Sequence, residues 1–439
     1  MSGFANGLTP KMRPLSPRKS VILSVLDVGT TKIVCIVARL RPVEADDVLP
    51  GRTHTCEILG IAHQRSGGVK TGAVVDMEAA EQAIRLAVDS AERMAGVQIE
   101  SVIVSVSAGR LASEAYAASV AIAGHPVEEG DIRRVLQAGS AHSVRPGRAV
   151  LHSLPTGFSL DATRHIRDPR GMVGRELGVD MHVVSADAAP MRNLMLCIER
   201  CHLDVEAMVA TPYASALASL VDDEAEIGTT LIDFGGGTTS VAVFAGGHFV
   251  HVDAVALGGG HVTMDVARGL SIAVDKAERL KTLHGSVLLG RSDDSDAIAV
   301  TPIGEDAREA TTYLPRSELL RIVLPRVEET LELVRDRLRA SGWAVEARRL
   351  VITGGASQLT GLPELARRIL DRPVRMGRPL GVRALPEIAK GPAFAAAAGL
   401  LVYPQMAGIE SLGTRPFRAS AGAPRGYFSK MGQWLKESF

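Results

Sequence analysis

An aspartate followed by a glycine-rich turn stands near the middle of the 439-residue sequence. Asp233 ends a short apolar run, and a second apolar run begins eight residues later, at Val241. The residues of interest between them are Gly235, Gly236, Gly237, Thr238 and Thr239. This order predicts a strand, a tight turn and a returning strand, whose uncovered glycine N–H groups and hydroxyls can cradle a phosphate. An aspartate just before such a turn is well placed to hold Mg²⁺ through water. Taken alone, the stretch is equally compatible with a plain hairpin and a solvated aspartate.

A second copy of the pattern lies about 200 residues upstream, which is roughly one domain length. Asp27 also follows an apolar run, and the turn residues after it are Gly29, Thr30, Thr31 and Lys32. When Asp27 is set on Asp233, the threonine pairs of the two stretches align with a two-residue gap. Two such hairpins in one chain predict a duplicated architecture, in which two lobes face a shared phosphate from opposite sides.

Three other features are candidates for the same site. A third glycine signal, Gly354, Gly355 and Ala356, follows an apolar strand-like run and would let a base or phosphate approach the backbone. Glu278 and Lys281 are three residues apart on a predicted helix and share one face, although a solvated salt bridge would look the same. Thr211 precedes Pro212 and is predicted to cap a helix over residues 212–221.

The composition is that of an ordinary globular protein. Apolar residues make up 46%, and 49 basic residues balance 49 acidic ones. A net charge of zero gives no reason to expect nucleic acid as a partner. The four cysteines lie in apolar contexts, which favours buried thiols over a metal site and fits a reducing cytoplasm. No apolar run approaches the roughly 18 residues of a transmembrane helix.

Changes in composition and in the spacing of apolar residues divide the rest of the chain into segments. Residues 1–20 are predicted to form a disordered basic tail. A helix capped by Asp76 carries an apolar stripe that runs to Met94. Residues 102–180 are predicted to form an inserted α/β unit, after which a strand at 182–185 resumes the first lobe. Pro325 should end or kink the helical stretch 315–340. Residues 404–425 are expected to form a flexible linker.

The last residues have an amphipathic pattern. Lys430, Gln433, Lys436 and Glu437 occupy one set of helical positions. The opposite face would present Phe428, Met431, Trp434, Leu435 and Phe439. An aromatic-rich helix with lysines on a linker suits a membrane surface. The alternative is a helix that docks on the protein's own body.

These motifs give the chain a specific resemblance. The two phosphate hairpins and the third glycine signal resemble the ATPase superfamily of actin, sugar kinases and heat-shock chaperones. The inserted unit and the amphipathic end narrow the resemblance to the FtsA family of bacterial cell-division proteins. The resemblance implies an α/β, actin-like two-lobed ATPase fold with duplicated ribonuclease-H-like lobes, an inserted 1C subdomain and a C-terminal amphipathic helix. The implied division is 1A at 21–101 and 181–209, 1C at 102–180, 2A at 210–260 and 347–403, 2B at 261–346, and a membrane-targeting helix at 426–439.

The resemblance also implies ligands. ATP would bind all three glycine signals, with Asp27 and Asp233 flanking Mg²⁺ through water. Glu278 and Lys281 would meet the ribose hydroxyls and the adenine face. In the chaperone relatives the position of Thr211 holds a glutamate that orients the attacking water, so the resemblance implies weak hydrolysis or none. No catalytic residue is assigned.

The partners implied by the resemblance are those of bacterial division. The C-terminal peptide of the tubulin-like FtsZ would dock around the exposed arginines Arg316, Arg321 and Arg326, although such charges are more often a solvated face. The protein would also form filaments, recruit later division proteins, and lie on the cytoplasmic face of the inner membrane at the septum.

Two other classes of protein remain compatible with the ATPase motifs. A sugar or acetate kinase would use the same three motifs, but nothing in the sequence marks a substrate carboxylate or explains the tail. An actin-like pilus-assembly protein of the PilM type has a similar core and an extra subdomain. The aromatic segment 428–439 distinguishes the cell-division hypothesis from both.

Overall fold

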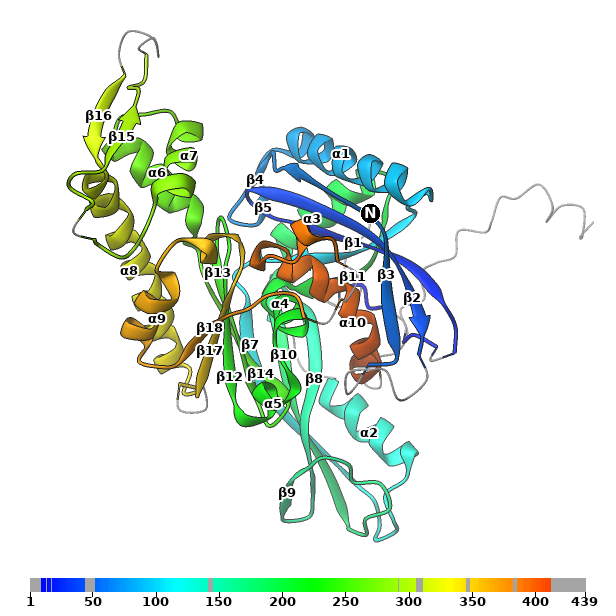
Figure 1. The fold of residues 1–439 in the computed structure, drawn as a ribbon. Coiled ribbons are helices and arrows are strands. Elements are labelled where there is room, and N and C mark those ends of the chain that lie inside the picture. Colours follow the sequence, from blue (N-terminus) through cyan, green and yellow to red (C-terminus); the bar gives the residue numbers. More distant parts are fainter. Residues whose placement is uncertain are drawn as a thin grey trace, which may run out of the picture.

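Two five-stranded sheets with the same strand arrangement form the core of the molecule. The computed structural model describes residues 9–12, 14–16, 18–43, 52–140, 145–290, 292–304, 311–344, 348–380, 382 and 385–411. In the first lobe the sheet order is β11-β6-β1-β2-β3 (Figure 1). Its strands are β1 (Val21–Val28), β2 (Lys32–Pro42), β3 (His54–Arg65), β6 (Ser101–Val106) and β11 (Asp204–Ala210).

The second lobe repeats this arrangement. Its order β14-β13-β12-β17-β18 again joins an antiparallel three-strand meander to two parallel strands. The strands are β12 (Thr229–Phe234), β13 (Thr239–Ala245), β14 (His248–Val255), β17 (Arg349–Thr353) and β18 (Val374–Met376). The duplicated architecture predicted from two hairpins is therefore confirmed at the level of strand order.

Helices cover the sheet of the first lobe because one face of each is apolar. In α1 (Met77–Ala95), Asp76 accepts a hydrogen bond from Ala79 N at 3.1 Å, as predicted for an N-cap. The stripe of α1 is buried from Ala80 to Ala91, but Met94 is 62% exposed and does not belong to it. The other covering helix is α3 (Ala188–Arg200), and the short strands β4 (Val69–Lys70) and β5 (Ala73–Val74) form a small hairpin nearby.

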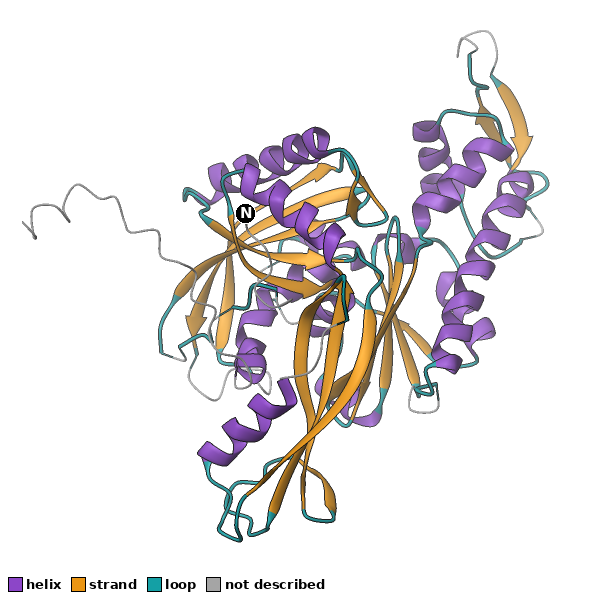
Figure 2. Cartoon of the chain, turned by 180° about the vertical axis from the view of Figure 1, so that it is seen from behind, coloured by secondary structure: helices purple, strands orange, loops and turns teal. Residues whose placement is uncertain are grey.

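An inserted subdomain with its own four-stranded sheet, ordered β7-β10-β8-β9, projects from the two lobes (Figures 1 and 2). Its elements are β7 (Ala112–Ala121), α2 (Glu129–Ser140), β8 (Arg148–Leu160), β9 (Thr163–Ile166) and β10 (Glu176–Asp187). The boundaries differ from those expected. β6 pairs with β1 and β11 in the first lobe, and residues 182–185 are the second half of β10 rather than a returning strand of that lobe.

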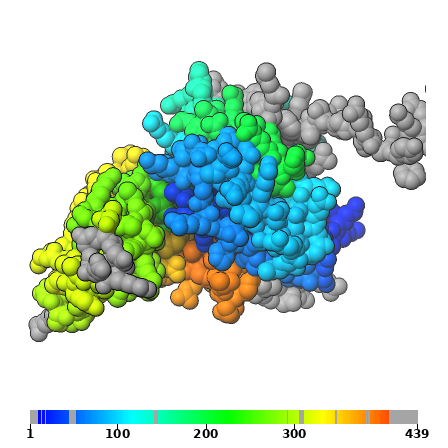
Figure 3. Space-filling view, turned by 90° about the horizontal axis from the view of Figure 1, so that it is seen from above, coloured from blue at the N-terminus to red at the C-terminus, as the bar shows by residue number. Residues whose placement is uncertain are grey.

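A helical unit stands on the second lobe. Its elements are α6 (Gly259–Gly269), α7 (Val274–His284), β15 (Ala297–Val300), β16 (Thr312–Pro315), α8 (Arg316–Ala340) and, beside the sheet, α9 (Leu362–Leu370). Seen from above, this unit and the first lobe form two neighbouring masses (Figure 3). Pro325 was expected to end or kink the helix, and it does not end it, because α8 continues through it. Pro325 lies on the exposed face, while Val323, Val327 and Leu331 bury the opposite one and hold the helix together.

Two helices connect the lobes at the centre of the molecule. They are α4 (Thr211–Ser219) and α10 (Ala395–Ser411), and the shorter elements around them are α5 (Asp222–Ile227), η3 (Gly355–Gln358), η4 (Glu387–Ala389) and η5 (Pro392–Phe394). α10 runs through Pro404 to Ser411, so its last turns occupy the beginning of the expected linker. The rest of the linker and the aromatic segment 428–439 lie outside the described residues. Within the described part of the chain, no helix combines the length and apolarity needed to span a membrane.

The described part of the N-terminal tail is ordered, which corrects the expectation of disorder. Thr9 is 3% exposed, and both its N–H and its hydroxyl donate to the carbonyl of Val150 in β8. Met12 and Leu15 pack against the core of the first lobe. β9 pairs with β8 only from Phe158 onward, so the earlier part of β8 has an edge that this segment covers. The basic composition of the tail did not reveal this pairing.

The crossing of α4 and α10 predicts a strong dependence on Gly399. A Cβ at Gly399 would lie 1.7 Å from the carbonyl oxygen of Ala214, so alanine would force the two helices apart. We expect Gly399→Ala to cost about 1–3 kcal/mol or more of unfolding free energy. The matched control is Gly130→Ala in α2, where a Cβ meets nothing within 4 Å and the change should be neutral or stabilising. Urea denaturation of both variants checks this, and equal midpoints would contradict it.

Candidate functional site

A cavity of about 550 Å³ lies at the junction of the two lobes. All three glycine signals line it, together with the start of α6 and residues of α7. Of the sixteen residues expected to form one binding site, fifteen line this cavity: Asp27, Gly29, Thr30, Thr31, Lys32, Asp233, Gly235, Gly236, Gly237, Thr238, Glu278, Lys281, Gly354, Gly355 and Ala356. The fold thus brings together segments that are more than 300 residues apart in sequence, from Asp27 to Ala356.

The two hairpins have turns of equal length. Gly29 N donates to Lys32 O at 3.0 Å, and Gly235 N donates to Thr238 O at 2.9 Å. The flanking pairs Val28–Ile33 and Phe234–Thr239 close the two turns in the same register. The alignment with a two-residue gap is therefore wrong, and Thr238 is the counterpart of Lys32.

This register explains why Thr239 does not line the cavity. It is the first residue of β13, is fully buried, and donates its hydroxyl to Leu257 O at 2.8 Å. Its structural role is to anchor the loop that leads into α6.

The tips of the two hairpins face each other closely. A Cβ at Gly236 would lie 2.5 Å from the methyl carbon of Thr31, and one at Gly237 would lie 2.4 Å from the hydroxyl of Thr30. These two glycines are therefore required by the approach of the first hairpin, in addition to leaving their N–H groups uncovered. Thr30 in turn accepts a hydrogen bond from Gly72 N at 3.0 Å.

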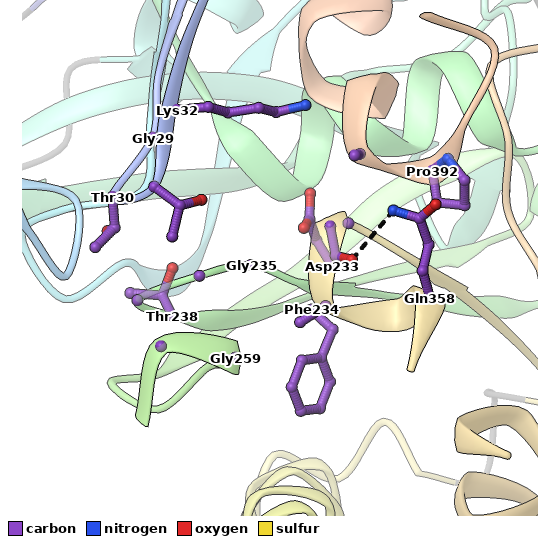
Figure 4. Close-up of a pocket in the computed structure, with 18 of the residues that line it drawn as sticks. Gly29, Thr30, Lys32, Asp233, Phe234, Gly235, Thr238, Gly259, Gln358 and Pro392 are labelled. Atoms are coloured by element: carbon purple, nitrogen blue, oxygen red, sulfur yellow. Dashed lines mark hydrogen bonds between the residues drawn. The ribbon is translucent and has the colours of Figure 1, made fainter. Parts of the chain in front are cut away.

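Two buried carboxylates and one ammonium group stand at the centre of the cavity. Asp27 and Asp233 are 9% and 7% exposed. Ser105 donates its hydroxyl to Asp27 at 2.5 Å, and Ser215 donates to Asp233. In Figure 4 the ammonium of Lys32 and the carboxylate of Asp233 enter the same space from opposite lobes.

Burial dominates the electrostatics of this group. Desolvation raises the pKa of Asp27, against the opposing effects of Ser105 and Lys32. Desolvation, with a further contribution from the charge of Asp27, raises the pKa of Asp233 to about 6. Desolvation lowers the pKa of Lys32, although both aspartates oppose the shift. A divalent cation at this position would remove the repulsion between the two carboxylates.

The third glycine signal is bound closely to Asp233. Gly354 has φ +90°, and a Cβ there would lie 2.4 Å from Asp233 Oδ1. Only glycine fits both the backbone conformation and this contact. The following turn, η3, places Gln358 at the cavity, where its amide donates to Gly355 O at 3.3 Å (Figure 4).

Glu278 and Lys281 form a salt bridge with each other, as one of the two interpretations of their spacing predicted. They also line the cavity, as the other interpretation predicted. Lys281 Nζ lies 2.6 Å from Glu278 Oε2, 2.8 Å from Thr263 Oγ1 and 3.0 Å from Gly259 O. Its ammonium therefore ties the first turn of α6 to α7. Half of the Glu278 side chain remains exposed, so its carboxylate can also accept hydrogen bonds from a ligand's hydroxyls.

Thr211 does not cap its helix. Ala210 occupies the N-cap position, α4 begins at Thr211 itself, and the Thr211 hydroxyl is buried without a hydrogen-bond partner while its residue lines the cavity. The capping prediction is wrong because the strand β11 runs directly into the helix. The hydroxyl is therefore available to a ligand or an ordered water in the cavity.

Some contributors could not be found from the sequence. Ser105 and Ser215 hold the two aspartates, yet serines in a strand and in a helix of small residues carry no signal for this role. Phe394, whose ring lies against the ammonium of Lys32, carries no signal for this role either.

The arginines expected on an exposed face of α8 are mostly engaged, which corrects that expectation. Arg316 is 24% exposed and binds Asp293 at 2.5 Å and His284 O at 2.8 Å. Arg326 is 27% exposed and binds Asp265 at 2.5 Å. Arg321 is 67% exposed and pairs with Glu318, three residues before it, at 2.9 Å. All three lie away from the cavity, on the helical unit.

A cleft between duplicated lobes, lined by paired Asp-x-Gly hairpins and a third glycine turn, defines a protein of the actin-like ATPase fold. A family model described as "Cell division protein FtsA" matches residues 230–399, and one described as "SHS2 domain inserted in FTSA" matches residues 108–185. The chain is 56% identical over 440 residues to the cell division protein FtsA of Rhizobium meliloti (strain 1021), with 100% of this chain and 99% of the relative covered. The chain belongs to the FtsA family of cell-division proteins.

Solved structures agree with the fold. A PilM-PilN type IV pilus biogenesis complex is similar with a TM-score of 0.57 and 17% identity, covering 88% of this chain and 99% of that one. MreB 5 of Spiroplasma citri bound to AMPPNP gives a TM-score of 0.51 at 13% identity, covering 88% and 96%. Such identities support a common fold alone, so the family rests on the relative at 56% identity, which favours the cell-division hypothesis over the kinase and PilM alternatives.

The environment of Arg316 predicts that it stabilises the helical unit. Asp293 is 3% exposed and also accepts a hydrogen bond from Gly290 N at 2.5 Å, so Arg316→Ala would leave a buried carboxylate without its cation. We expect a loss of about 1–3 kcal/mol of unfolding free energy, reduced from the value of a fully buried pair because Arg316 is partly solvated. Arg321→Ala is the control and should change stability by less than about 0.5 kcal/mol. Similar denaturation midpoints for the two variants would refute this role of Arg316.

Proposed function

We propose that this FtsA-family protein binds Mg-ATP in the cavity between its lobes and links FtsZ filaments to the cytoplasmic face of the inner membrane at the division septum. The observation that carries the ATP part is the pair of buried aspartates on matched hairpins around one cavity. The linking part rests on family membership and on the amphipathic sequence of the last residues.

The residues at the cavity suit a magnesium–phosphate ligand. No group of three or more His, Cys, Asp or Glu side chains that could hold a metal is found among the residues the structure describes. Mg²⁺ commonly takes one or two carboxylates and completes its shell with water and phosphate oxygens. Asp27 and Asp233 would supply the carboxylates, and the ion would neutralise phosphate charge. The uncovered N–H groups of Gly236 and Gly237, with Lys32, would bind phosphate oxygens.

We propose that the protein hydrolyses ATP weakly or not at all. Thr211 brings a hydroxyl to the cavity, and a hydroxyl of ordinary pKa is a poor general base for water. The buried carboxylates of the cavity, Asp27 and Asp233, are engaged by Ser105 and Ser215 and would be occupied by the metal. ATP would then act mainly as a ligand that holds the two lobes in a fixed relation and favours filament formation.

The proposed partner contacts lie away from the cavity. The C-terminal peptide of FtsZ would dock around Arg316–Arg326, where Arg321 offers the most exposed guanidinium to an acidic group. Arg316 and Arg326 already form ion pairs with Asp293 and Asp265. We therefore propose that these two arginines stabilise the surface on which the peptide docks and do not pair with the peptide themselves. The segment with Phe428, Met431, Trp434, Leu435 and Phe439 would anchor filaments on lipid, where recruited division proteins also assemble.

The two aspartates predict a metal- and pH-dependent affinity for ATP. Asp233 must be ionised to attract Mg²⁺, and with a pKa of about 6 it becomes protonated as the pH falls below that value. The gain in ATP affinity on adding Mg²⁺ should therefore shrink between pH 7.5 and pH 5.5. Asp233→Asn keeps the size of the side chain and should reduce the gain by about tenfold, or 1.4 kcal/mol, at pH 7.5.

Isothermal titration of wild-type and Asp233→Asn protein, with Mg²⁺ and with EDTA, measures this effect. In EDTA the variant should bind ATP at least as well as the wild type, because a carboxylate that repels phosphate has been removed. The same magnesium gain in both proteins would place the metal elsewhere.

The tail predicts that membrane binding depends on its aromatic face. Trp434→Glu removes a large apolar side chain whose burial in lipid contributes about 1.5–3 kcal/mol, so the full chain should leave anionic vesicles. Gln433→Glu adds the same charge on the opposite face and should have a much smaller effect. Co-sedimentation with phosphatidylcholine–phosphatidylglycerol vesicles, with and without FtsZ, measures both binding and linkage.

The linking function requires that FtsZ pellet with vesicles only when the full chain is present. A chain ending at residue 425 should bind FtsZ in solution but fail to carry it to the vesicles. Equal pelleting of FtsZ with the truncated chain would exclude the tail as the anchor and remove the main support for this function.

A further inference from the structure

The ammonium of Lys32 lies over an aromatic ring. Lys32 Nζ is 3.5 Å from the centroid of the Phe394 ring, well inside the distance of about 6 Å at which a cation is attracted to the face of a ring. Phe394 is 7% exposed, so water competes little for this contact. In Figure 4 the Lys32 side chain extends from the first hairpin toward the start of α10. Lys32 lines the cavity with Pro392 and Ala393, which are the two residues before Phe394.

The ring is held in place from both lobes. It belongs to η5, whose Pro392 carbonyl accepts hydrogen bonds from Gly354 N at 3.2 Å and from Thr353 Oγ1 at 3.3 Å. Thr353 is the last residue of β17 in the second lobe, and Gly354 follows it. On the first lobe, the imidazole of His63 meets the ring edge-on, with centroids 5.9 Å apart and planes at 86°. Phe394 is therefore fixed by β17 and β3 while its face is presented to Lys32.

Burial and the charges of the two aspartates also act on Lys32. Its neighbour Thr31 is at the tip of the turn, and its own backbone carbonyl closes that turn. Burial disfavours its charge, while the carboxylates of Asp27 and Asp233 attract it toward the centre of the cavity. Both carboxylates attract the Lys32 ammonium, and the Phe394 ring opposes this attraction by holding the ammonium 3.5 Å from its centroid.

We propose that Phe394 is a positioning residue, which holds the Lys32 ammonium so that it meets the phosphates of the nucleotide without first having to leave a carboxylate. This inference rests on the proposed function, because it assumes that the cavity binds Mg-ATP. Phe394 does not contact the ligand. It acts through Lys32, and its contribution is the preorganisation of a cation in a site that already contains two anions.

A double-mutant cycle on Mg-ATP affinity tests this role. Phe394→Leu keeps an apolar side chain but removes the ring face, and it should weaken Mg-ATP binding by about three- to tenfold, as expected for the loss of a cation–π contact. Phe394→Tyr keeps the face and should bind within about twofold of the wild type. In the Lys32→Met background, Phe394→Leu should cause no further loss, because the cation that it positions is gone.

The outcomes separate the possible failures. Equal losses in the Leu and Tyr variants, or a Phe394→Leu loss that persists in the Lys32→Met background, would overturn the positioning role and leave Phe394 as an ordinary core residue. If the Leu variant does not fold by circular dichroism, Phe394→Met takes its place in the same cycle. A wild-type chain that binds no Mg-ATP would refute the proposed function itself, whereas wild-type binding without coupling would refute only the role of Phe394.

Discussion

The burial of two carboxylates at one point is the constraint on which the rest of the site depends. Asp27 and Asp233 are each the last residue but one of the first strand of a hairpin in their own lobe, and desolvation disfavours the charge of both. Ser105 and Ser215 offset part of this cost by donating hydrogen bonds, and Lys32 offsets another part by its charge. The residues that surround the two aspartates must therefore either donate a hydrogen bond to a carboxylate or leave room for it. Gly354 is the clearest case, because a Cβ there would collide with Asp233 Oδ1.

The same constraint explains how the lobes are joined. Ser215 belongs to α4, which also brings Thr211 to the cavity, so that one helix supports the carboxylate and lines the ligand space. The backbone of Ala214 meets Gly399 of α10, where no side chain fits between the helices. If Asp233 moves, α4 has to move with it, because Ser215 is bonded to its carboxylate. The close contact of Ala214 and Gly399 means that α4 cannot slide along α10 unless the two helices first separate.

The sequence was sufficient to predict the duplicated fold and about half of the residues that line the cavity, because these follow from local patterns. Hydrophobic runs bounded by glycine predict strands and turns, and two such hairpins predict two lobes. The errors have a common origin in tertiary contacts. Pro325 was expected to end or kink a helix, but α8 continues through it because its buried face outweighs one missing hydrogen bond. Thr9 was expected to be disordered, but it pairs with an edge of β8 that no local pattern reveals. The exposure of Arg316 was misjudged because Asp293 is supplied by a separate loop.

The inserted subdomain is tied to the second lobe by a relay of hydrogen bonds that leaves its orientation little freedom. Val252 N donates to the hydroxyl of Ser113 at 2.9 Å, this hydroxyl is bonded to His182 Nε2 at 2.5 Å, and His182 Nδ1 lies 2.8 Å from Phe249 O. Burial lowers the pKa of His182 to about 3, so the ring is neutral and its single N–H is fixed toward Phe249. Two backbone groups of the edge strand β14, Val252 N and Phe249 O, are thus bonded by side chains of β7 and β10 instead of by another strand. Phe249 also stacks on Tyr213 of α4, with ring centroids 4.8 Å apart. The helix α4, which supports Asp233, therefore packs against β14, the strand to which the inserted subdomain is bonded. The inserted subdomain and the support of Asp233 meet at this one strand.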